Sequence, residues 1–163
     1  MTELVYLLLG SNLGDRAGTM TKATAQLAEH HFEIVNRSSF YETQPWGIED
    51  QPVFLNMVVV GWWRSTARSL LELCLEIEQL LGRVRNRKWG ERIIDIDILY
   101  FGQQVIDDRD LRVPHPGIPE RRFTLVPLSE IAPDFIHPIS QQSNRELLES
   151  CPDQSGVNLY KPD

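Results

Sequence analysis

Cysteine is scarce in this sequence, which contains only Cys74 and Cys151 among its 163 residues. The two form no C-x-x-C pair and no zinc-ligand spacing, which excludes a zinc-binding module and a dithiol redox motif. Long apolar runs are also missing, because none approaches the roughly 20 residues of a membrane-spanning helix. The N-terminus lacks the basic start of a signal peptide. We therefore expect a cytoplasmic protein with reduced cysteines and no membrane partner.

Positive charge is in short supply as well: 16 Lys and Arg residues stand against 23 Asp and Glu residues, which gives a net charge of −7. An acidic chain is a poor generic binder of nucleic acid, so we expect no such partner. The sequence also lacks repeats, low-complexity segments and linkers, and its length fits one domain. We expect a single domain over residues 1–163, with a loose tail from about residue 151.

Hydrophobic patterning predicts alternating strands and helices. The first apolar run stops at Gly10, which is typical of a buried strand, and Asp15 is a suitable N-cap for the following helix. A later helix has apolar residues at spacings of four, three and four, which form one buried stripe. In chain order we expect a strand over 4–9, a helix over 16–31, strands over 32–41 and 53–63, a helix over 65–81, a strand ending at 101 and a short helix over 124–131.

This order of elements predicts the fold class. Strand, helix, strand, strand, helix, strand is the split βαβ pattern of a ferredoxin-like α+β sandwich. We expect a mainly antiparallel sheet, with helices on one face and long active-site loops on the other. Segments 42–52, 83–92 and 113–122 would then converge near the strand that carries Asp95 and Asp97.

That strand has two unlike faces in the sequence. Isoleucines at 94, 96 and 98 alternate with Asp95 and Asp97, and alternate residues of a strand share a face. We therefore expect the isoleucines in the core and both carboxylates on the opposite face. Two carboxylates about 7 Å apart on a rigid strand suit Mg²⁺, which prefers oxygen ligands. A solvated acidic face is the alternative, and the pattern alone favours neither.

Basic residues crowd the segment just upstream, namely Arg83, Arg85, Arg87, Lys88 and Arg92. Acids for a metal beside bases for phosphate are what phosphoryl transfer requires, because that chemistry depends mainly on positioning and charge neutralisation. The combination favours the metal-site interpretation. The turn at residues 10–15 lacks the Gly-Lys-Ser/Thr ending of a Walker A loop, so we do not expect a phosphate-binding loop there.

Four further residues each allow two interpretations. Trp46, in a proline-rich segment, could contact a ligand or fold back on the core. Asn56 interrupts an apolar strand and must find partners, either the backbone or the edge of a heterocycle. Glu78 lies near a helix C-terminus, where an acid is unfavourable, and could serve an arginine or a ligand. His115, between two prolines, could contact a ligand or pack within its loop.

Seven segments together resemble one known family. Residues 88–99 match its signature, Lys-x-Gly-Glu-Arg-x-x-Asp-Ile-Asp-Ile-Leu, at every fixed position. The other matching segments are residues 8–14, 40–43, 50–56, 82–85, 113–115 and 121–123. On these residues the chain resembles the 6-hydroxymethyl-7,8-dihydropterin pyrophosphokinases of folate biosynthesis.

The resemblance implies that ATP donates its β,γ-diphosphate to the hydroxymethyl oxygen of the pterin and that AMP leaves. It implies a monomer in which Asp95 and Asp97 hold two Mg²⁺ ions, and in which Arg83 and Arg92 stabilise the transferred group. The implied ATP site consists of Glu78, Arg85, Lys88, Trp89, Ile98, Arg112, His115, Pro116 and Arg121. The implied pterin site, whose two phenylalanines would flank the ring and whose asparagine would read its edge, consists of Thr43, Pro45, Trp46, Phe54, Asn56 and Phe123.

Two other functions are compatible with part of the pattern. A different Mg²⁺-dependent phosphoryl transferase or phosphohydrolase would release ADP and phosphate instead of AMP. An RNA-binding module of the same fold class would use the basic segment and Trp89. The net charge and the lack of an RNP1-type aromatic strand argue against that second alternative.

Overall fold

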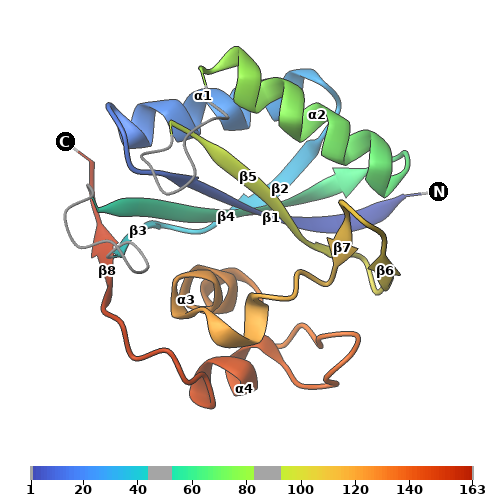
Figure 1. The fold of residues 1–163 in the computed structure, drawn as a ribbon, viewed down its shortest axis with the longest axis vertical. Coiled ribbons are helices and arrows are strands. Elements are labelled where there is room, and N and C mark those ends of the chain that lie inside the picture. The colour runs from blue at the N-terminus through green and yellow to red at the C-terminus, as the bar shows by residue number, and fades with distance from the viewer. Residues whose placement is uncertain (1, 44–52, 83–92, 163) are drawn as a thin grey trace.

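The computed structural model of the chain describes residues 2–43, 53–82 and 93–162. In chain order its elements are β1 (Glu3–Ser11), α1 (Arg16–Glu29), β2 (Glu33–Arg37), β3 (Phe40–Thr43), β4 (Phe54–Trp63), α2 (Ala67–Leu80), β5 (Asp95–Phe101), β6 (Ile106–Asp107), β7 (Arg112–Val113), the 3₁₀ helix η1 (Ile118–Glu120), α3 (Arg122–Ile131), α4 (Asn144–Glu149) and β8 (Val157–Tyr160). Its central sheet has α1 and α2 on one face and α3 on the other, and α4 lies beyond α3 (Figure 1).

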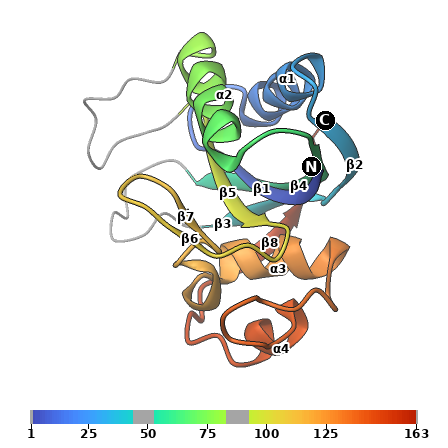
Figure 2. The same cartoon turned by 90° about the vertical axis from the view of Figure 1, so that its right-hand side faces the viewer.

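The central sheet has six strands in the order β5-β1-β4-β3-β8, with β2 also paired to β4. Its strand pairs among the described residues are antiparallel. Helices α1 and α2 cover one face (Figure 2), which confirms the ferredoxin-like prediction. The expectation of helices on one face alone is wrong, because α3 covers the second face and buries a second apolar cluster there, with α4 packed against α3.

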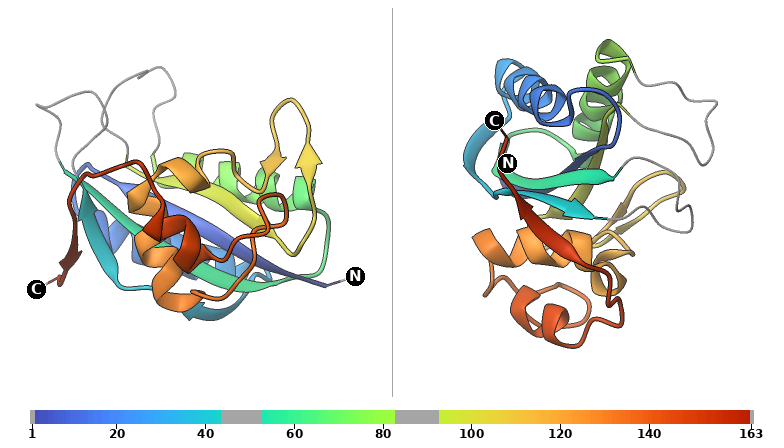
Figure 3. Two further views of the ribbon diagram at one scale, coloured as in Figure 1. Left: turned by 90° about the horizontal axis from the view of Figure 1, so that it is seen from below. Right: turned by 90° about the vertical axis from the view of Figure 1, so that its left-hand side faces the viewer.

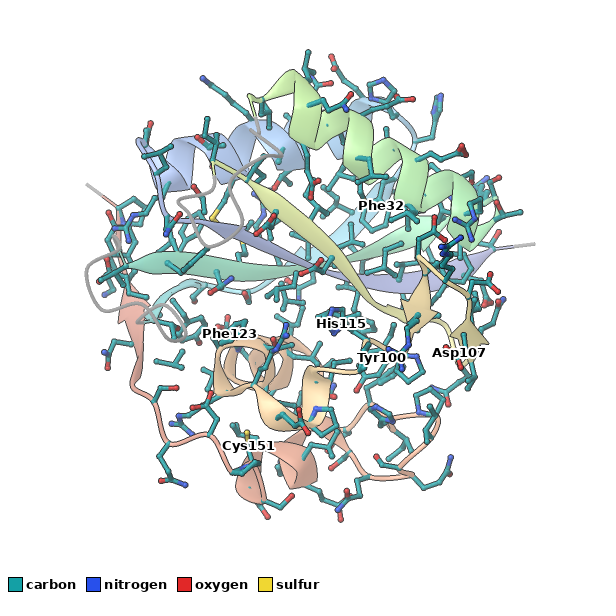
Figure 4. All side chains as sticks on the ribbon, in the orientation of Figure 1. Phe32, Tyr100, Asp107, His115, Phe123 and Cys151 are labelled. Atoms are coloured by element: carbon teal, nitrogen blue, oxygen red, sulfur yellow. The ribbon has the colours of Figure 1, made fainter. Side chains whose placement is uncertain are left out.

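Strand β1 shows why the first apolar run has no alternation. Val5, Leu7 and Leu9 belong to the buried cluster beneath α1 and α2, whereas Tyr6 and Leu8 belong to the cluster beneath α3 and α4. A strand covered on both faces has a continuous apolar sequence. Figure 4 shows the two side-chain layers that result, one on each side of the sheet.

Local sequence features set the ends of the two long helices. The Asp15 carboxylate accepts a hydrogen bond from the Gly18 amide at 3.1 Å, and the Thr66 hydroxyl accepts one from the Ser69 amide at 3.0 Å. Such N-caps satisfy amides that the first helical turn leaves unpaired. After α2, Gly82 has a φ of +97°, a left-handed conformation that glycine adopts readily. No helix among the described residues is long and apolar enough to cross a bilayer.

The strand predicted over 32–41 is divided into β2 and β3 at Ser38. The Ser38 amide donates to the Val58 carbonyl at 2.8 Å, and its hydroxyl accepts from the Val58 amide at 2.9 Å. The side chain thus takes the place of a backbone partner and interrupts the ladder. Hydrophobic patterning does not detect such a local substitution.

The prediction of a loose tail from about residue 151 is wrong for the residues that the structure describes. Cys151 is buried, and Asp153 accepts a hydrogen bond from the Arg122 amide at 3.0 Å, which anchors the segment at the start of α3. Beyond it, β8 pairs with β3 at the edge of the sheet (Figure 3). An edge strand leaves backbone groups that a neighbouring segment can satisfy by pairing.

Candidate active site

Strand β5 has the two unlike faces that its sequence predicts. Ile94, Ile96 and Ile98 lie in the buried cluster beneath α1 and α2. Asp95 and Asp97 are half-buried on the opposite face, and Asp97 pairs with Leu8 of the second cluster. The predicted separation of isoleucines and aspartates is confirmed. Both carboxylates therefore project to the α3 side of the sheet and lie outside the apolar interior.

A row of paired residues crosses the sheet from Asp95. Asp95 pairs with Gly10, Gly10 pairs with Asn56, and Asn56 pairs with Tyr41. Residues paired directly across neighbouring strands share a face, so these four form one row. With neighbouring strands about 4.8 Å apart, the backbones of Asp95 and Asn56 are about 10 Å apart. The predicted metal ligand and the predicted pterin contact therefore lie on one face and close together.

Gly10 keeps the middle of this row open. A Cβ atom at Gly10 would lie 2.7 Å from Nδ2 of Asn56, which is far inside van der Waals contact. Asn56 is 5% exposed, and its Nδ2 donates to the Leu9 carbonyl at 3.4 Å. The glycine thus lets the Asn56 amide lie over β1. The sequence allowed either the backbone or a heterocycle as the partner of Asn56, and the structure shows the backbone contact.

Thr43 and Phe54 extend the same face toward β3. Thr43 pairs with Phe54, which lies two residues from Asn56, so the three side chains share a face. Thr43 is buried, and its Oγ1 has no hydrogen-bond partner among the described residues. A buried hydroxyl without a partner is costly, so Thr43 is suited to contact a polar ligand.

His115 is held at the same side by two hydrogen bonds. Its amide donates to the Leu99 carbonyl at 2.9 Å, and its ring Nδ1 accepts from the Gly117 amide at 3.0 Å. Burial, followed by the charges of Arg121 and Arg112, lowers the pKa of His115 to about 4. The ring is therefore neutral near pH 7, and its proton lies on Nε2 because Nδ1 is an acceptor. His115 presents a neutral hydrogen-bond donor.

Arg121 and Phe123 flank the start of α3. The guanidinium carbon of Arg121 lies 5.8 Å from the centre of the Phe123 ring, within cation–π range. A Cβ atom at Gly117 would lie 2.7 Å from Nε of Arg121, so the glycine makes room for the guanidinium. Figure 4 shows His115 and Phe123 on the α3 side of the sheet, the side of Asp95 and Asn56. A cation and an aromatic ring thus join the polar row.

Glu78 has a partner that its sequence position does not reveal. It is 3% exposed, and its Oε2 accepts a hydrogen bond from the Ile96 amide at 2.7 Å. That amide lies between Asp95 and Asp97 on the outermost strand of the sheet. The carboxylate therefore holds the acidic strand from α2. The sequence indicated an arginine or a ligand as its partner; the structure shows this backbone amide contact, and the arginine or ligand stays a prediction.

Three other predicted ATP contacts, Ile98, Arg112 and Pro116, lie outside the polar row that runs from Asp95 to Asn56. The Ile98 side chain belongs to the buried cluster beneath α1 and α2, away from the carboxylate face. Arg112 forms an ion pair with Asp107 at 3.3 Å across the β6–β7 hairpin, and both side chains are exposed. Pro116 is exposed beside His115. Their roles at an ATP site stay predictions.

Seven predicted site residues lie outside the described residues, and their roles also stay predictions. They come from the proline-rich and the basic segments and are Pro45, Trp46, Arg83, Arg85, Lys88, Trp89 and Arg92.

Tyr41 and Glu130 form a contact that sequence reasoning missed. The Tyr41 hydroxyl donates to Glu130 at 2.5 Å, and the Ser39 amide donates to the same carboxylate at 3.1 Å. Burial, reinforced by Glu130, raises the pKa of Tyr41 to about 12. The pair ties α3 to β3 next to Asn56. The matching segment 40–43 contains Tyr41, but nothing in the sequence links it to a residue so far along the chain.

The donor set fits magnesium better than a metal enclosed by protein alone. Among the residues that the structure describes, no group of three or more His, Cys, Asp and Glu side chains could hold a metal. Asp95 and Asp97 supply two half-buried carboxylates on one strand. Mg²⁺ is usually bound by one or two carboxylates together with waters and substrate phosphates. The two residues fit an ion that arrives with a nucleotide.

Comparison with known sequences gives consistent matches. The sequence model of a family described as 7,8-dihydro-6-hydroxymethylpterin-pyrophosphokinase matches residues 6–133. A Methylorubrum extorquens protein named 2-amino-4-hydroxy-6-hydroxymethyldihydropteridine pyrophosphokinase is 49% identical over 154 residues, covering 93% of this chain and 95% of its own. A Bacillus subtilis protein of the same name is 43% identical over 162 residues, covering 99% and 92%.

Solved structures match the fold. The crystal structure of wild-type Plasmodium falciparum HPPK-DHPS aligns with a TM-score of 0.73 and 18% identity over 91% of this chain. The chain spans 44% of that protein. At this identity the likeness supports the arrangement of strands and helices, and it says nothing about individual side chains.

Proposed function

The chain belongs to the 7,8-dihydro-6-hydroxymethylpterin-pyrophosphokinase family, and we propose that its reaction takes place on the sheet face that carries Asp95, Asp97 and Asn56. The protein is a folate-biosynthesis enzyme that transfers the diphosphate of ATP to the hydroxymethyl group of 6-hydroxymethyl-7,8-dihydropterin and releases AMP. The proposal concerns where each substrate binds and which residues hold it.

One observation supports this location above all others. The register from Asp95 through Gly10 to Asn56 puts the predicted metal ligand and the predicted pterin contact in a single row. Strands hold side chains more rigidly than loops do, so a row on a sheet can fix two substrates relative to each other. Fixing the reacting groups in this way accounts for much of the rate of a two-substrate transfer.

On the pterin side, polar groups would orient the ring. The Asn56 amide offers both a donor and an acceptor, which matches the edge of a pterin, and the buried Thr43 hydroxyl offers a second contact. Phe54 and Phe123 would flank the ring by offset stacking, and Pro45 and Trp46 would complete this side. The hydroxymethyl group would then point along the row toward the aspartates.

On the nucleotide side, Asp95 and Asp97 would hold two Mg²⁺ ions together with the phosphates. When bound, the ions supply neutralisation of the triphosphate charge. His115 would donate from Nε2, and Arg121 would add a positive charge. The remaining ATP contacts would be Glu78, Arg85, Lys88, Trp89, Ile98, Arg112 and Pro116. Arg83 and Arg92 would stabilise the transferred diphosphate.

Product analysis tests the proposal directly. The purified protein is incubated with ATP, Mg²⁺ and 6-hydroxymethyl-7,8-dihydropterin, and nucleotides and pterins are separated by chromatography. We expect AMP and a diphosphorylated pterin in equal amounts. Release of ADP and phosphate would indicate a different phosphoryl transferase or a phosphohydrolase. Without Mg²⁺ we expect turnover to stop, and activity that survives chelation would contradict the assignment of Asp95 and Asp97.

We further propose that the protein works as a cytoplasmic monomer on these small substrates. The support is the family resemblance, because a one-sheet site of this kind needs no second copy. Sedimentation at working concentrations checks the monomer, and microscopy of a fluorescent fusion checks the compartment. If the sedimentation mass and the specific activity both rose with protein concentration, the monomer would be contradicted.

A further inference from the structure

Arg16, the first residue of α1, joins three elements at one end of the sheet. Its Nη1 donates to the Val53 carbonyl at 2.8 Å, and its Nη2 donates to Glu42 at 2.8 Å. Its guanidinium carbon lies 5.1 Å from the centre of the Tyr160 ring. One side chain thus contacts β3, the residue before β4, and β8. The start of α1 and β8 lie at the same end of the molecule (Figure 1).

The partners of Arg16 adjoin two proposed pterin contacts. Glu42 directly precedes Thr43, and Val53 directly precedes Phe54. Thr43 and Phe54 are paired across β3 and β4. A single guanidinium therefore spans the two strands at the pair whose side chains face the proposed pterin site. A change at Arg16 would be transmitted to both contacts.

The geometry uses properties that only arginine has. The planar guanidinium presents donors in a fixed fork, so two nitrogens can bind two acceptors at once. The side chain of Arg16 is 19% exposed and that of Glu42 is 36% exposed, so water screens this pair less than a surface pair. A lysine ammonium is a point charge and would not reproduce both contacts at this spacing.

Tyr160 connects the C-terminal strand to this cluster. It pairs with Phe40 in the β3–β8 ladder, which brings its ring against Arg16. The other end of the same segment is fixed by Asp153 at the Arg122 amide, one residue before Phe123. Residues 153–160 therefore connect the start of α3, next to Phe123, with the Arg16 cluster, next to Thr43 and Phe54.

From these contacts we propose that Arg16, supported by Tyr160, is a positioning residue for pterin binding. It holds Thr43 and Phe54 in register, and it does not itself contact the substrate. The inference rests on the proposed function, since it concerns the pterin site of that reaction. A residue that only stabilised the fold would change the melting temperature and would affect both substrates alike.

The test compares the two substrates in steady-state kinetics. Loss of two charge-assisted hydrogen bonds in Arg16→Met should raise the KM for the pterin about 10-fold. The KM for ATP should change by less than about 2-fold, because the perturbed groups lie on the pterin side. Arg16→Lys should fall between the wild type and Arg16→Met, because it keeps the charge and loses the fork.

Arg68 provides a matched control. It stands at the start of α2 and also binds two partners, Asp110 at 2.7 Å and Asp108 at 3.5 Å. These contacts lie away from Thr43 and Phe54. Arg68→Met should leave both KM values unchanged within about 2-fold, since distant sites act independently.

Tyr160 variants keep the inference testable if Arg16→Met does not fold. Tyr160→Phe retains the ring and should behave as the wild type, whereas Tyr160→Ala should raise the pterin KM about 3-fold by removing the cation–π contact. Equal pterin KM values in the Phe and Ala variants would overturn the role of Tyr160. An unchanged pterin KM, or parallel changes in both KM values, in Arg16→Met would overturn the role of Arg16.

The proposed function and this inference can fail separately. If the wild type makes no AMP and no diphosphorylated pterin, the proposed function fails, and the inference falls with it. If the wild type is active and the KM values do not separate in the variants, only the inference fails.

Discussion

The two faces of strand β5 are built for different purposes. On the α1 and α2 side, Ile94 directly before the strand and Ile96 and Ile98 within it are 0%, 4% and 5% exposed and lie in a continuous apolar cluster. On the α3 side, Asp95 and Asp97 stay half-buried next to Gly10 and Leu8. One strand of seven residues thus contributes both to the core and to the candidate site.

The difference shows how the fold keeps stability and chemistry apart. The isoleucine face gains free energy from burial, about 25 cal/mol per Å² of apolar surface. Asp95 and Asp97 contribute no comparable apolar burial and place two like charges about 7 Å apart on one strand. Substitutions on the first face should therefore change stability, and substitutions on the second should change activity.

The largest effect we expect is on activity, from Asp97→Ala. Loss of a predicted metal ligand should lower kcat/KM on the order of 10³-fold, because charge neutralisation of the triphosphate carries much of the catalysis. The melting temperature should stay within a few degrees of the wild type, because no apolar contact is lost. Steady-state kinetics with saturating Mg²⁺ and a thermal melt check both halves of the prediction.

Asp134→Ala is the control for Asp97→Ala. Asp134 is a strongly exposed carboxylate that pairs with Arg145 at 3.2 Å, and its loss should leave kcat/KM unchanged. A similar loss of activity in both variants would break the contrast between the faces. So would an Asp97→Ala enzyme that retains more than about a tenth of wild-type activity.

The next largest effect is on stability, from Ile96→Ala on the opposite face. Truncating a buried isoleucine should lower the free energy of unfolding by about 3 kcal/mol. Chemical denaturation gives this value from the shift in midpoint. Val105→Ala is the control, because Val105 is 57% exposed and should change stability by less than about 0.5 kcal/mol. An Ile96→Ala protein as stable as the wild type would mean that this face contributes less to the free energy of unfolding than its burial indicates.

Sequence alone predicted those structural features that are determined by residues close together in the chain. The alternation of isoleucine and aspartate determines the two faces of β5, and the caps Asp15 and Thr66 determine where α1 and α2 begin. These features depend on local periodicity and on hydrogen bonds within a few residues. The resemblance added roles and further residues to the candidates that the pattern had already indicated, but it could not show their spacing.

The row from Asp95 to Asn56 could not be predicted, because it depends on register. The strands that form it are separated by dozens of residues, and a shift of one residue would turn Asn56 to the other face. The contact between Glu78 and the Ile96 amide was missed for a similar reason, since that amide belongs to β5 and not to a sequence neighbour of Glu78. The pairing of β8 was missed because four residues are too few to show a strand pattern.

A smaller effect, from Gly10→Ala, tests whether the row acts as a unit. The new Cβ would lie 2.7 Å from Nδ2 of Asn56, so the amide must move. The pterin KM should rise about 5-fold, with a stability loss of about 1 kcal/mol from the strained contact. Gly156→Ala is the control, because its Cβ would meet the nearest atom at 3.7 Å, an ordinary contact. An unchanged pterin KM in Gly10→Ala would show that Asn56 is not a contact of the pterin.

The smallest effect we expect is the pH dependence of stability that His115 contributes on the α3 side. Its pKa falls from the ordinary 6.5 to about 4 in the folded protein. The folded state therefore favours the neutral ring, because burial and the nearby charges of Arg121 and Arg112 disfavour a charged imidazolium. The contribution of the neutral His115 ring to the free energy of unfolding is fully present above pH 6.5, and it is lost as the pH falls from 6.5 through about 4.

His115→Gln should remove this pH dependence and leave the rest of the stability profile in place. Because the ring is partly exposed, we expect a difference of about 1 kcal/mol or less between the wild type and the variant across that window. Denaturant unfolding at a series of pH values measures it. If both proteins lose stability in parallel as the pH falls, other groups carry the acid sensitivity. The neutral state of His115, and with it the Nε2 donor on the nucleotide side, would then be wrong.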